Sequence, residues 1–432
     1  MNIFKNTVIY RLLKSRFFIF LLRLPFVIAF VFIIVSGLFG SVYRNADNFI
    51  VGPAWLLFIT LAALLAGKIW CLVCPWNALA EWIQDILRIP NAKFRVPKIF
   101  HNFWIPLYFL IILIWLEYSI EMTDHPRLIA YLALLVFGIT FISMLFFPRK
   151  TFCRYGCPVG AICGLYGLFA PLELRSADKD TCRKCLTKDC IKGNEKGDPC
   201  PVFEYPGQMD TNLYCILCAE CIKTCPNENI AFNLRLPAQE LIKQKTLNIS
   251  EAFLIITMLA LSVFGAINIS AAHFSVISWT STHLSISEPL THILTMAALI
   301  IAFSMILYLI SFISRIGIAN LIGVFLPIAL FNHFSNTVKL FSIRAEESIS
   351  LISDPLGLSW NLFGTAGHLP KPLLTANQLI YITGPIMLIG LLYSFYLSYC
   401  LAAANNKSRI SIILFILPVI SVVWFNWWLI GK

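Results

Sequence analysis

The chain has 432 residues, of which 59% are hydrophobic and only 13% are charged. Because an ordinary globular domain is roughly 25% charged, this composition excludes a typical soluble protein and indicates an integral membrane protein. The formal net charge is +11, but Lys and Arg concentrate in short segments beside apolar stretches, so membrane topology explains them and a nucleic-acid partner is excluded.

Nine apolar stretches predict transmembrane helices, because about 20 mainly apolar residues cross a bilayer and a single strand cannot satisfy its backbone there. In chain order they lie near residues 17–39, 52–70, 101–120, 128–147, 252–272, 290–313, 317–334, 375–400 and 410–428. The stretch at 317–334 is the weakest, because it is short and contains Pro327. The basic N-terminal segment has no clear small-residue cleavage site, so we expect a retained first helix.

A polar insert of about residues 175–250 divides these stretches. The expected fold class is an α-helical polytopic membrane protein with an inserted bacterial-type two-cluster ferredoxin domain. Its domains are expected to be a four-helix membrane domain at 1–174, the ferredoxin domain at 175–250 and a five-helix membrane domain of unknown role at 251–432.

The distribution of basic residues predicts the orientation in the membrane. Lys and Arg crowd the N-terminal segment, the loop after the second stretch, the end of the fourth and the loop after the eighth, whereas the other loops carry few or mixed charges. By the positive-inside rule, the N-terminus and the ferredoxin domain face the cytoplasm and the C-terminus lies outside. The expected location is a bacterial-type inner membrane.

Two similar motifs follow the second and fourth stretches. They read GKIWCLVCPWNAL and RKTFCRYGCPVGAI, so Lys, an aromatic residue, Cys, Cys-Pro and Ala recur in the same order. Each motif ends a two-helix hairpin on the same side, and a parallel repeat of this kind places a site between its copies. We therefore expect four cysteines to converge at the membrane edge: Cys71, Cys74, Cys153 and Cys157.

Three interpretations of these membrane-edge cysteines remain open. They bind a third centre, which is an iron-sulfur cluster or a single metal ion; they form a redox-active dithiol; or they are small residues packed at a turn. Two Cys-Pro pairs at matching positions favour a functional role, and we favour metal ligation over a disulfide. Cys163, six residues after Cys157, is either an alternate ligand or a core-packing residue, and we favour core packing.

The polar insert contains CILCAECIKTCP at residues 215–226, and this run matches the spacing of bacterial ferredoxins at every position. In such a run, three cysteines hold one [4Fe–4S] cluster, and the fourth, just before proline, ligates the other cluster. A looser partner run precedes it, in which three closely spaced cysteines are followed by Cys200-Pro201.

We assign the eight insert cysteines to two [4Fe–4S] clusters. The first cluster takes Cys182, Cys185, Cys190 and Cys225. The second cluster takes Cys215, Cys218, Cys221 and Cys200. Zinc is the alternative for a four-cysteine site, but two Cys-Pro closures and a complete ferredoxin run argue against it. Disulfides are disfavoured by the cytoplasmic placement.

This combination of motifs resembles the membrane polyferredoxins of the NapH, NosR and CcoG type over roughly residues 15–235. The resemblance implies electron transfer between the quinone pool or cytoplasmic donors and periplasmic reductases, or help in metal-centre assembly. That family usually has Cys-x3-Cys-Pro twice, which Cys153 and Cys157 fit, whereas Cys71 and Cys74 are one residue closer together. The last five stretches are not part of the family pattern.

Residues 251–432 carry no recognised motif, but six of the seven histidines are expected on or near the outer face. One interpretation is a haem or metal site or a quinone pocket, because imidazole is a common ligand of such centres. Its candidates flank helix ends: His273, His292 and His333. The other interpretation, which we favour, is that these histidines are scattered and tolerated at the interface.

The sequence predicts a membrane-bound electron-transfer protein, the electron-transfer subunit of an oxidoreductase system. It would relay electrons among the cytoplasmic clusters, the membrane-edge cysteines and the quinone pool or an outer-face acceptor, with a quinone or a soluble redox donor as partner. The alternative is an accessory factor that assembles metalloenzymes or reduces metals or thiols. A transporter is disfavoured because no series of polar helices builds a substrate path. The direction of electron flow is not fixed by the sequence.

Overall fold

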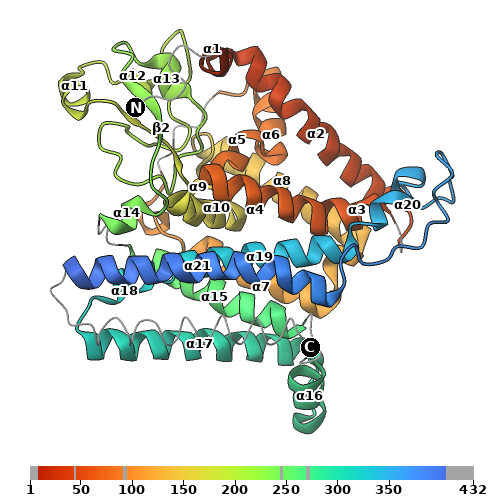
Figure 1. Cartoon of the computed structure of the whole chain (residues 1–432). Helices are drawn as coiled ribbons and strands as arrows, with labels where there is room; N and C mark the ends of the chain where they lie inside the picture. Colours follow the sequence, from red (N-terminus) through yellow and green to blue (C-terminus); the bar gives the residue numbers. More distant parts are fainter. Residues whose placement is uncertain are drawn as a thin grey trace. The chain divides into compact units, whose positions relative to one another are not determined.

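The computed structural model describes residues 8–42, 45–90, 94, 96–243, 247–268 and 273–404, and it is mostly helical (Figure 1). The longer helices are α2 (Arg16–Phe39), α4 (Trp55–Ala66), α6 (Pro75–Ile86), α7 (Trp104–Ile120), α8 (Pro126–Phe146), α10 (Pro158–Phe169), α15 (Ile249–Asn268), α17 (Glu288–Ser314), α19 (Leu326–Arg344) and α21 (Ala376–Ala404). The shorter helices are α1 (Val8–Lys14), α3 (Ala46–Phe49), α5 (Trp70–Val73), α9 (Thr151–Tyr155), α11 (Lys179–Lys184), α12 (Asp189–Lys192), α13 (Glu220–Thr224), α14 (Gln239–Ile242), α16 (Trp279–Leu284), α18 (Ile318–Gly323) and α20 (Glu347–Ser353). Two strands, β1 (Leu172–Ser176) and β2 (Ile230–Leu234), form an antiparallel ribbon.

Seven helical stretches within the described residues are long and apolar enough to cross a membrane, which supports the prediction of a helical membrane protein. They are Arg16–Phe39, Ala46–Ile86, Pro126–Phe146, Ile249–Asn268, Glu288–Ser314, Ile318–Arg344 and Asn377–Ala404. The stretch expected at 101–120 forms the shorter helix α7, and the one expected at 410–428 lies outside the described residues. The expected count of nine is therefore not confirmed.

The weakest predicted stretch, 317–334, is part of a longer helical region that ends at Arg344. Pro327 lies in the first turn of α19, where a missing N–H breaks no helical hydrogen bond, so the proline begins this helix instead of interrupting it. Two polar side chains of α19 bond to neighbouring segments: Asn332 donates from its amide nitrogen to Ser262 at 2.6 Å. Thr337 shares a hydrogen bond with Thr60 at 3.1 Å, so the helix continues past the expected end.

The chain divides into two compact units, each of which combines three separate segments. Unit 1 consists of Met1–Ile34, Leu61–Pro106 and Tyr131–Glu240. Unit 2 consists of Val35–Thr60, Leu107–Ala130 and Leu241–Lys432. Of the fourteen cysteines, only Cys400 belongs to unit 2, so every cysteine assigned above to a metal centre lies in unit 1.

The β ribbon of unit 1 supports the polar insert. It pairs Leu174 with Phe232 and Ser176 with Ile230, so alternate side chains face one side of the ribbon. Leu174, Phe232 and Ile230 are buried in one hydrophobic cluster, to which the side chains of Cys215 and Cys221 also belong. The insert is therefore a folded part of unit 1, and it shares this core with Ala66 of α4.

Two glycines in unit 1 allow a close approach of three segments. Gly67 follows α4 with a φ of +61°, and a Cβ at this position would lie 2.7 Å from Gly167 Cα in α10. A Cβ at Gly167 would in turn lie 2.9 Å from the carbonyl oxygen of Asn212 in the insert. Only glycine combines this positive φ with this lack of space. The contacts place α10 against both the first hairpin motif and the insert.

Candidate iron-sulfur centres

The two Cys-Pro motifs form matching helix starts. Cys74 precedes α6 and Cys157 precedes α10, with proline at the first position of each helix. Proline suits that position because it leaves no N–H unpaired and its φ is already helical. Cys71 in α5 and Cys153 in α9 lie one short turn earlier in each motif. The two motifs therefore have the same local structure despite their different spacing.

The structure brings the four membrane-edge cysteines together inside unit 1. Burial raises the pKa of the Cys153 thiol well above its ordinary value, Lys150 opposes that rise, and three other thiols add to it: those of Cys71, Cys74 and Cys157. The pKa of Cys157 is raised to about 11 by its burial and then by Cys71. These contributions indicate that the four thiols lie near one another, because a Coulomb interaction weakens with distance. That they form a metal site stays a prediction.

Two buried lysines join the motifs reciprocally. Lys68, three residues before Cys71, donates from Nζ to the carbonyl oxygen of Cys153 at 3.3 Å. Lys150, three residues before Cys153, donates from Nζ to the carbonyl oxygen of Cys71 at 3.1 Å. The two lysines are 0% and 3% exposed. A buried ammonium group is costly unless negative charge compensates it; the Glu81 carboxylate lies 3.8 Å from Lys150, and an anionic group among the four cysteines would compensate both lysines.

Further polar side chains lie beside the buried lysines and the membrane-edge cysteines. Glu81 of α6 accepts a hydrogen bond from Arg23 of α2 at 2.7 Å and lies 3.8 Å from the Lys150 ammonium group. The Cys153 thiol donates to Asn77 Oδ1 at 3.7 Å. No sequence motif indicates the roles of Arg23, Asn77 and Glu81, whereas the Lys before the first cysteine recurs in both copies of the repeat.

Cys163 lies nearer to the site than its interpretation as core packing implied. It is buried in α10, and the thiols of Cys71, Cys157 and Cys74 contribute to the rise in its pKa, after burial itself. The structure therefore places a fifth thiol beside the four predicted ones.

The first group of insert cysteines contains Cys182, Cys185, Cys190 and Cys225. Asn229 bridges two of them: its backbone N–H donates to Cys225 Sγ at 3.4 Å, and its side-chain amide donates to Cys182 Sγ at 3.3 Å. Burial raises the pKa of Cys190 to about 12, with further contributions from Cys225 and Cys182. The last cysteine of the regular run thus lies beside the looser run.

The second group contains Cys215, Cys218, Cys221 and Cys200. Burial raises the pKa of Cys215 to about 12, and the nearby Cys200 thiol adds to that rise. The Cys200 sulfur accepts a hydrogen bond from the backbone N–H of Glu204 at 3.3 Å. Cys200 therefore lies with the regular run, although it is distant from it in sequence.

The donor groups fit [4Fe–4S] clusters. All fourteen cysteines are free thiols, and the insert sulfurs accept N–H groups of the kind that stabilise cluster thiolates. Among the described residues, no three His, Cys, Asp or Glu side chains stand close enough together to hold a single metal ion. A cubane requires wider spacing, because its iron and sulfide ions lie between the four thiolates.

A buried apolar contact connects the two kinds of site. Cys71 belongs to one hydrophobic cluster with Val202 and Ile216 of the insert, and Cys200 and Cys218 pack against the same cluster. The membrane-edge cysteines and the second insert group therefore lie on two sides of the same apolar wall.

The histidines of unit 2 agree only partly with the sequence prediction. His273 and His292 lie together, with ring centroids 6.2 Å apart, and His292 is buried beside Phe264. Both ring nitrogens of His292 lack a hydrogen-bond partner within the described residues. His333, expected at a helix end, lies in the interior of α19 because that helix continues to Arg344. The expected placement of His333 at a helix end is therefore wrong, and its role as a ligand stays a prediction.

Comparison with known proteins places an iron-sulfur match on the two hairpins. A family described as a 4Fe-4S binding domain matches residues 48–97 and 129–173. These two segments contain Cys71, Cys74, Cys153 and Cys157 and end before the insert cysteines. No solved structure matches the chain significantly.

Curated relatives match less than half of the chain. An uncharacterized protein of Methanocaldococcus jannaschii is 27% identical over 216 residues, which are 46% of this chain and 81% of the relative. YccM of Escherichia coli is 25% identical over 228 residues, or 48% of this chain and 60% of the relative. The ferredoxin-type protein NapH of Escherichia coli is 24% identical over 201 residues, or 41% of this chain and 67% of the relative.

The apolar helices, the grouped thiols and the matched 4Fe-4S binding domain define an iron-sulfur membrane protein. Over about half of its length, the chain is homologous to membrane polyferredoxin-type proteins such as NapH and YccM. The predicted resemblance is confirmed to that extent.

Proposed function

We propose that this protein relays electrons in the membrane between two insert clusters, a third centre at the membrane-edge cysteines, and the quinone pool or an outer-face acceptor. The family match and the relatives support the general class, an iron-sulfur electron-transfer membrane protein. Among those relatives, the name of YccM describes a candidate electron transport protein, and that of NapH a ferredoxin-type protein. When bound, the clusters supply one-electron redox chemistry.

The apolar wall between the two kinds of site carries this proposal. Ile216 is 0% exposed and Val202 is 2% exposed, so the wall against which Cys71, Cys200 and Cys218 pack is apolar and buried. A dry, closely packed connection shortens the path of an electron and lowers the reorganisation that water would add. Neither site needs a moving domain to reach the other.

Arg154 of α9 fastens the insert beside the membrane-edge site. Its guanidinium forms an ion pair with Glu204 at 2.8 Å, donates to the carbonyl oxygen of Val202 and lies 4.3 Å from the ring centroid of Tyr214. Because Arg154 directly follows Cys153, one residue links the second Cys-Pro motif to the insert. Through these contacts, Arg154 holds the membrane-edge cysteines and the insert clusters at a fixed separation.

The proposed ligands are those predicted from the sequence. Cys182, Cys185, Cys190 and Cys225 hold the first cluster; Cys215, Cys218, Cys221 and Cys200 hold the second. We further propose that the third centre is a [4Fe–4S] cluster on Cys71, Cys74, Cys153 and Cys157, because the matched family falls on these residues. The N-terminus and the insert face the cytoplasm in this proposal, and the acceptor is the quinone pool or a partner at the outer face.

The test measures the iron content and the cluster EPR signals of the purified protein and of the double variant Cys74→Ser/Cys157→Ser. We expect the double variant to lose about a third of the iron and one set of EPR signals, because one of three equal clusters is removed. Cys400→Ser, outside unit 1, is the matched control and should keep all iron. Unchanged iron and unchanged EPR-monitored redox titrations in the double variant would refute the third centre.

A further inference from the structure

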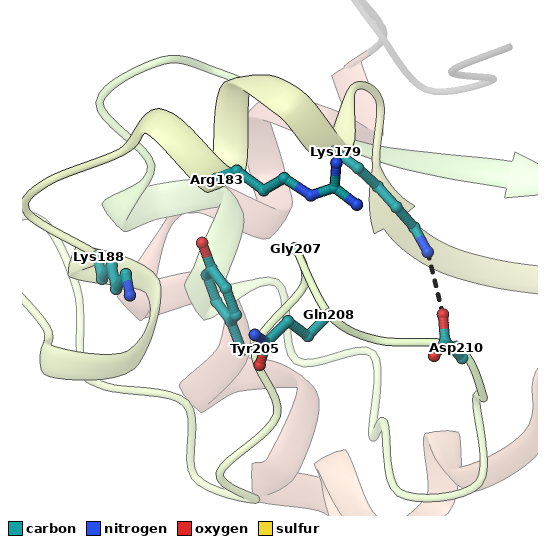
Figure 2. A pocket seen from close by; sticks show the side chains of 7 residues that line it. All are labelled: Lys179, Arg183, Lys188, Tyr205, Gly207, Gln208 and Asp210. Carbon is teal, nitrogen blue, oxygen red and sulfur yellow. Dashed lines mark hydrogen bonds and ion pairs between the residues drawn. The ribbon is translucent and has the colours of Figure 1, made fainter.

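A hollow whose lining includes three cationic side chains and one carboxylate opens beside the first group of insert cysteines. Figure 2 shows Lys179, Arg183 and Lys188 around it, together with Tyr205 and Asp210. These cations come from α11 and from the loop before α12, so the hollow surrounds the segment that carries Cys182 and Cys185. Nothing in the proposed relay so far uses this surface.

The wall of the hollow touches a proposed cluster ligand. Gly207 lines the hollow, and a Cβ built on it would lie 2.6 Å from Cys182 Cβ. Tyr205, which also lines the hollow, donates from its hydroxyl to the carbonyl oxygen of Cys182 at 2.6 Å. A molecule seated in the hollow is therefore separated from Cys182 by one glycine without a side chain.

Positive charge predominates on this surface. Lys179 forms an ion pair with Asp210 at 3.0 Å, and Arg183 pairs with Asp180 at 3.0 Å. All four partners are more than half exposed, and exposed pairs of this kind contribute little and exchange easily. The Lys188 ammonium group lies 5.6 Å from the Tyr205 ring centroid. Asp178, which caps α11, and Asp189, beside Lys188, are further carboxylates near the hollow, so the excess of positive charge lies in its lining.

An exposed apolar side chain accompanies the charges. Leu186 directly follows Cys185 and is 93% exposed. A large apolar residue among charged ones is typical of a protein contact surface, where it is covered by the partner. The combination favours a folded protein partner with an acidic rim and an apolar centre.

We propose that this hollow and Leu186 form the docking site of an acidic soluble protein that carries one electron at a time. The inference rests on the proposed function, because it requires a cluster at Cys182, Cys185, Cys190 and Cys225. One electron leaves the reduced iron-sulfur cluster of the carrier and reduces the first insert cluster; no proton or group is transferred. A nicotinamide does not fit this role directly, because it delivers a hydride with two electrons and a cluster accepts one.

The test measures the rate at which a dithionite-reduced, acidic bacterial-type ferredoxin reduces the clusters of the full-length protein in neutral-lipid nanodiscs. We expect the second-order rate constant to fall as ionic strength rises, because charge complementarity accelerates encounter. Arg183→Glu/Lys188→Glu should lower the rate at low salt roughly tenfold or more. A salt-independent rate in the unmodified protein would overturn the proposal.

The matched control is Lys192→Glu/Lys196→Glu, which makes the same charge change on exposed residues of the insert that do not line the hollow. It should lower the rate less than threefold, and equal losses in both double variants would overturn the proposal. Reduction by methyl viologen radical cation should not slow in either variant; slowing there would show that the substitutions act on the cluster and not on docking. Absence of cluster EPR signals in the unmodified protein would instead refute the proposed function.

Discussion

Lys68 and Cys153 connect the two hairpin motifs: the buried ammonium group of Lys68 donates to the carbonyl oxygen of Cys153 at 3.3 Å. Lys150 donates in the same way to the carbonyl oxygen of Cys71 at 3.1 Å, so the lysine of each motif bonds to the first cysteine of the other motif. This reciprocity brings two positive charges to the four membrane-edge cysteines. A third centre there would be held in a field that favours its more negative, reduced state.

Replacing Lys68 by Met is therefore expected to lower the reduction potential of the third centre. Removal of one buried charge should shift the oxidised-to-reduced ratio about tenfold, or ~59 mV for one electron. Lys150→Met should shift it in the same direction. The measurement is a redox titration followed by EPR. Lys98→Met, at an exposed position, is the control. An unchanged potential in both buried variants, with iron retained, would contradict an electrostatic role.

The amide of Asn229 is expected to tune the first insert cluster. It donates to Cys182 Sγ at 3.3 Å, and N–H groups directed at a thiolate stabilise the extra negative charge of the reduced cluster. Asn229→Ala should lower the potential of that cluster and leave the other two unchanged. Asn194→Ala is the control, because Asn194 bonds to Asp189 and Thr224 and to no sulfur. A shift of equal size in the control would show a general loosening of the insert.

The sequence predicted those parts of the site that depend on local spacing. The Cys-Pro pairs begin helices because proline fixes the first helical φ, and that effect needs only two neighbouring residues. The grouping of Cys225 with Cys182 followed from the geometry of a ferredoxin run, and Asn229 now bridges these two residues.

The remaining features depend on tertiary contacts that no spacing encodes. The reciprocal contacts of Lys68 and Lys150 exist only once the two motifs are packed together. The length of α19 depends on partners from other segments, such as Ser262 for Asn332. In a hydropathy pattern, polar residues such as Asn332 and Thr337 indicate the end of a membrane helix. His333 was therefore expected at a helix end.

Gly67 is expected to be essential for the packing of the two hairpins. Alanine there would have to adopt a φ of +61° and place its Cβ 2.7 Å from Gly167 Cα. Left-handed backbone strain and the overlap should together destabilise unit 1 by about 2–4 kcal/mol. Thermal unfolding in detergent, followed by loss of cluster absorbance, measures this. Gly138→Ala in α8 is the control, since no atom of the described residues beyond its own helical turn lies within 4 Å of the new Cβ, and it should unfold at or slightly above the parental temperature.

Cys185 and Cys190 are expected to differ strongly in reactivity once iron is removed. Hydrogen bonds from the Lys188 backbone and the Thr187 hydroxyl lower the pKa of Cys185, whereas burial raises that of Cys190 to about 12. A lowered pKa means more thiolate at neutral pH, and thiolate is the form that reacts. Iodoacetamide at about pH 7.5 should therefore alkylate Cys185 at least roughly tenfold faster than Cys190.

Mass spectrometry of peptides from the iron-depleted protein, after its helicity has been checked, measures both rates. The alkylation rate of Cys185 should approach its maximum at a lower pH than that of an ordinary thiol, and Cys190 should react appreciably only in strongly alkaline solution. In the iron-loaded protein, both residues should be protected, because their thiolates are then ligands. Thr187→Val removes one hydrogen bond to the Cys185 sulfur and should slow its alkylation near neutral pH. Equal rates for the two cysteines in the folded, iron-depleted protein would show that their surroundings do not control the thiolate charge.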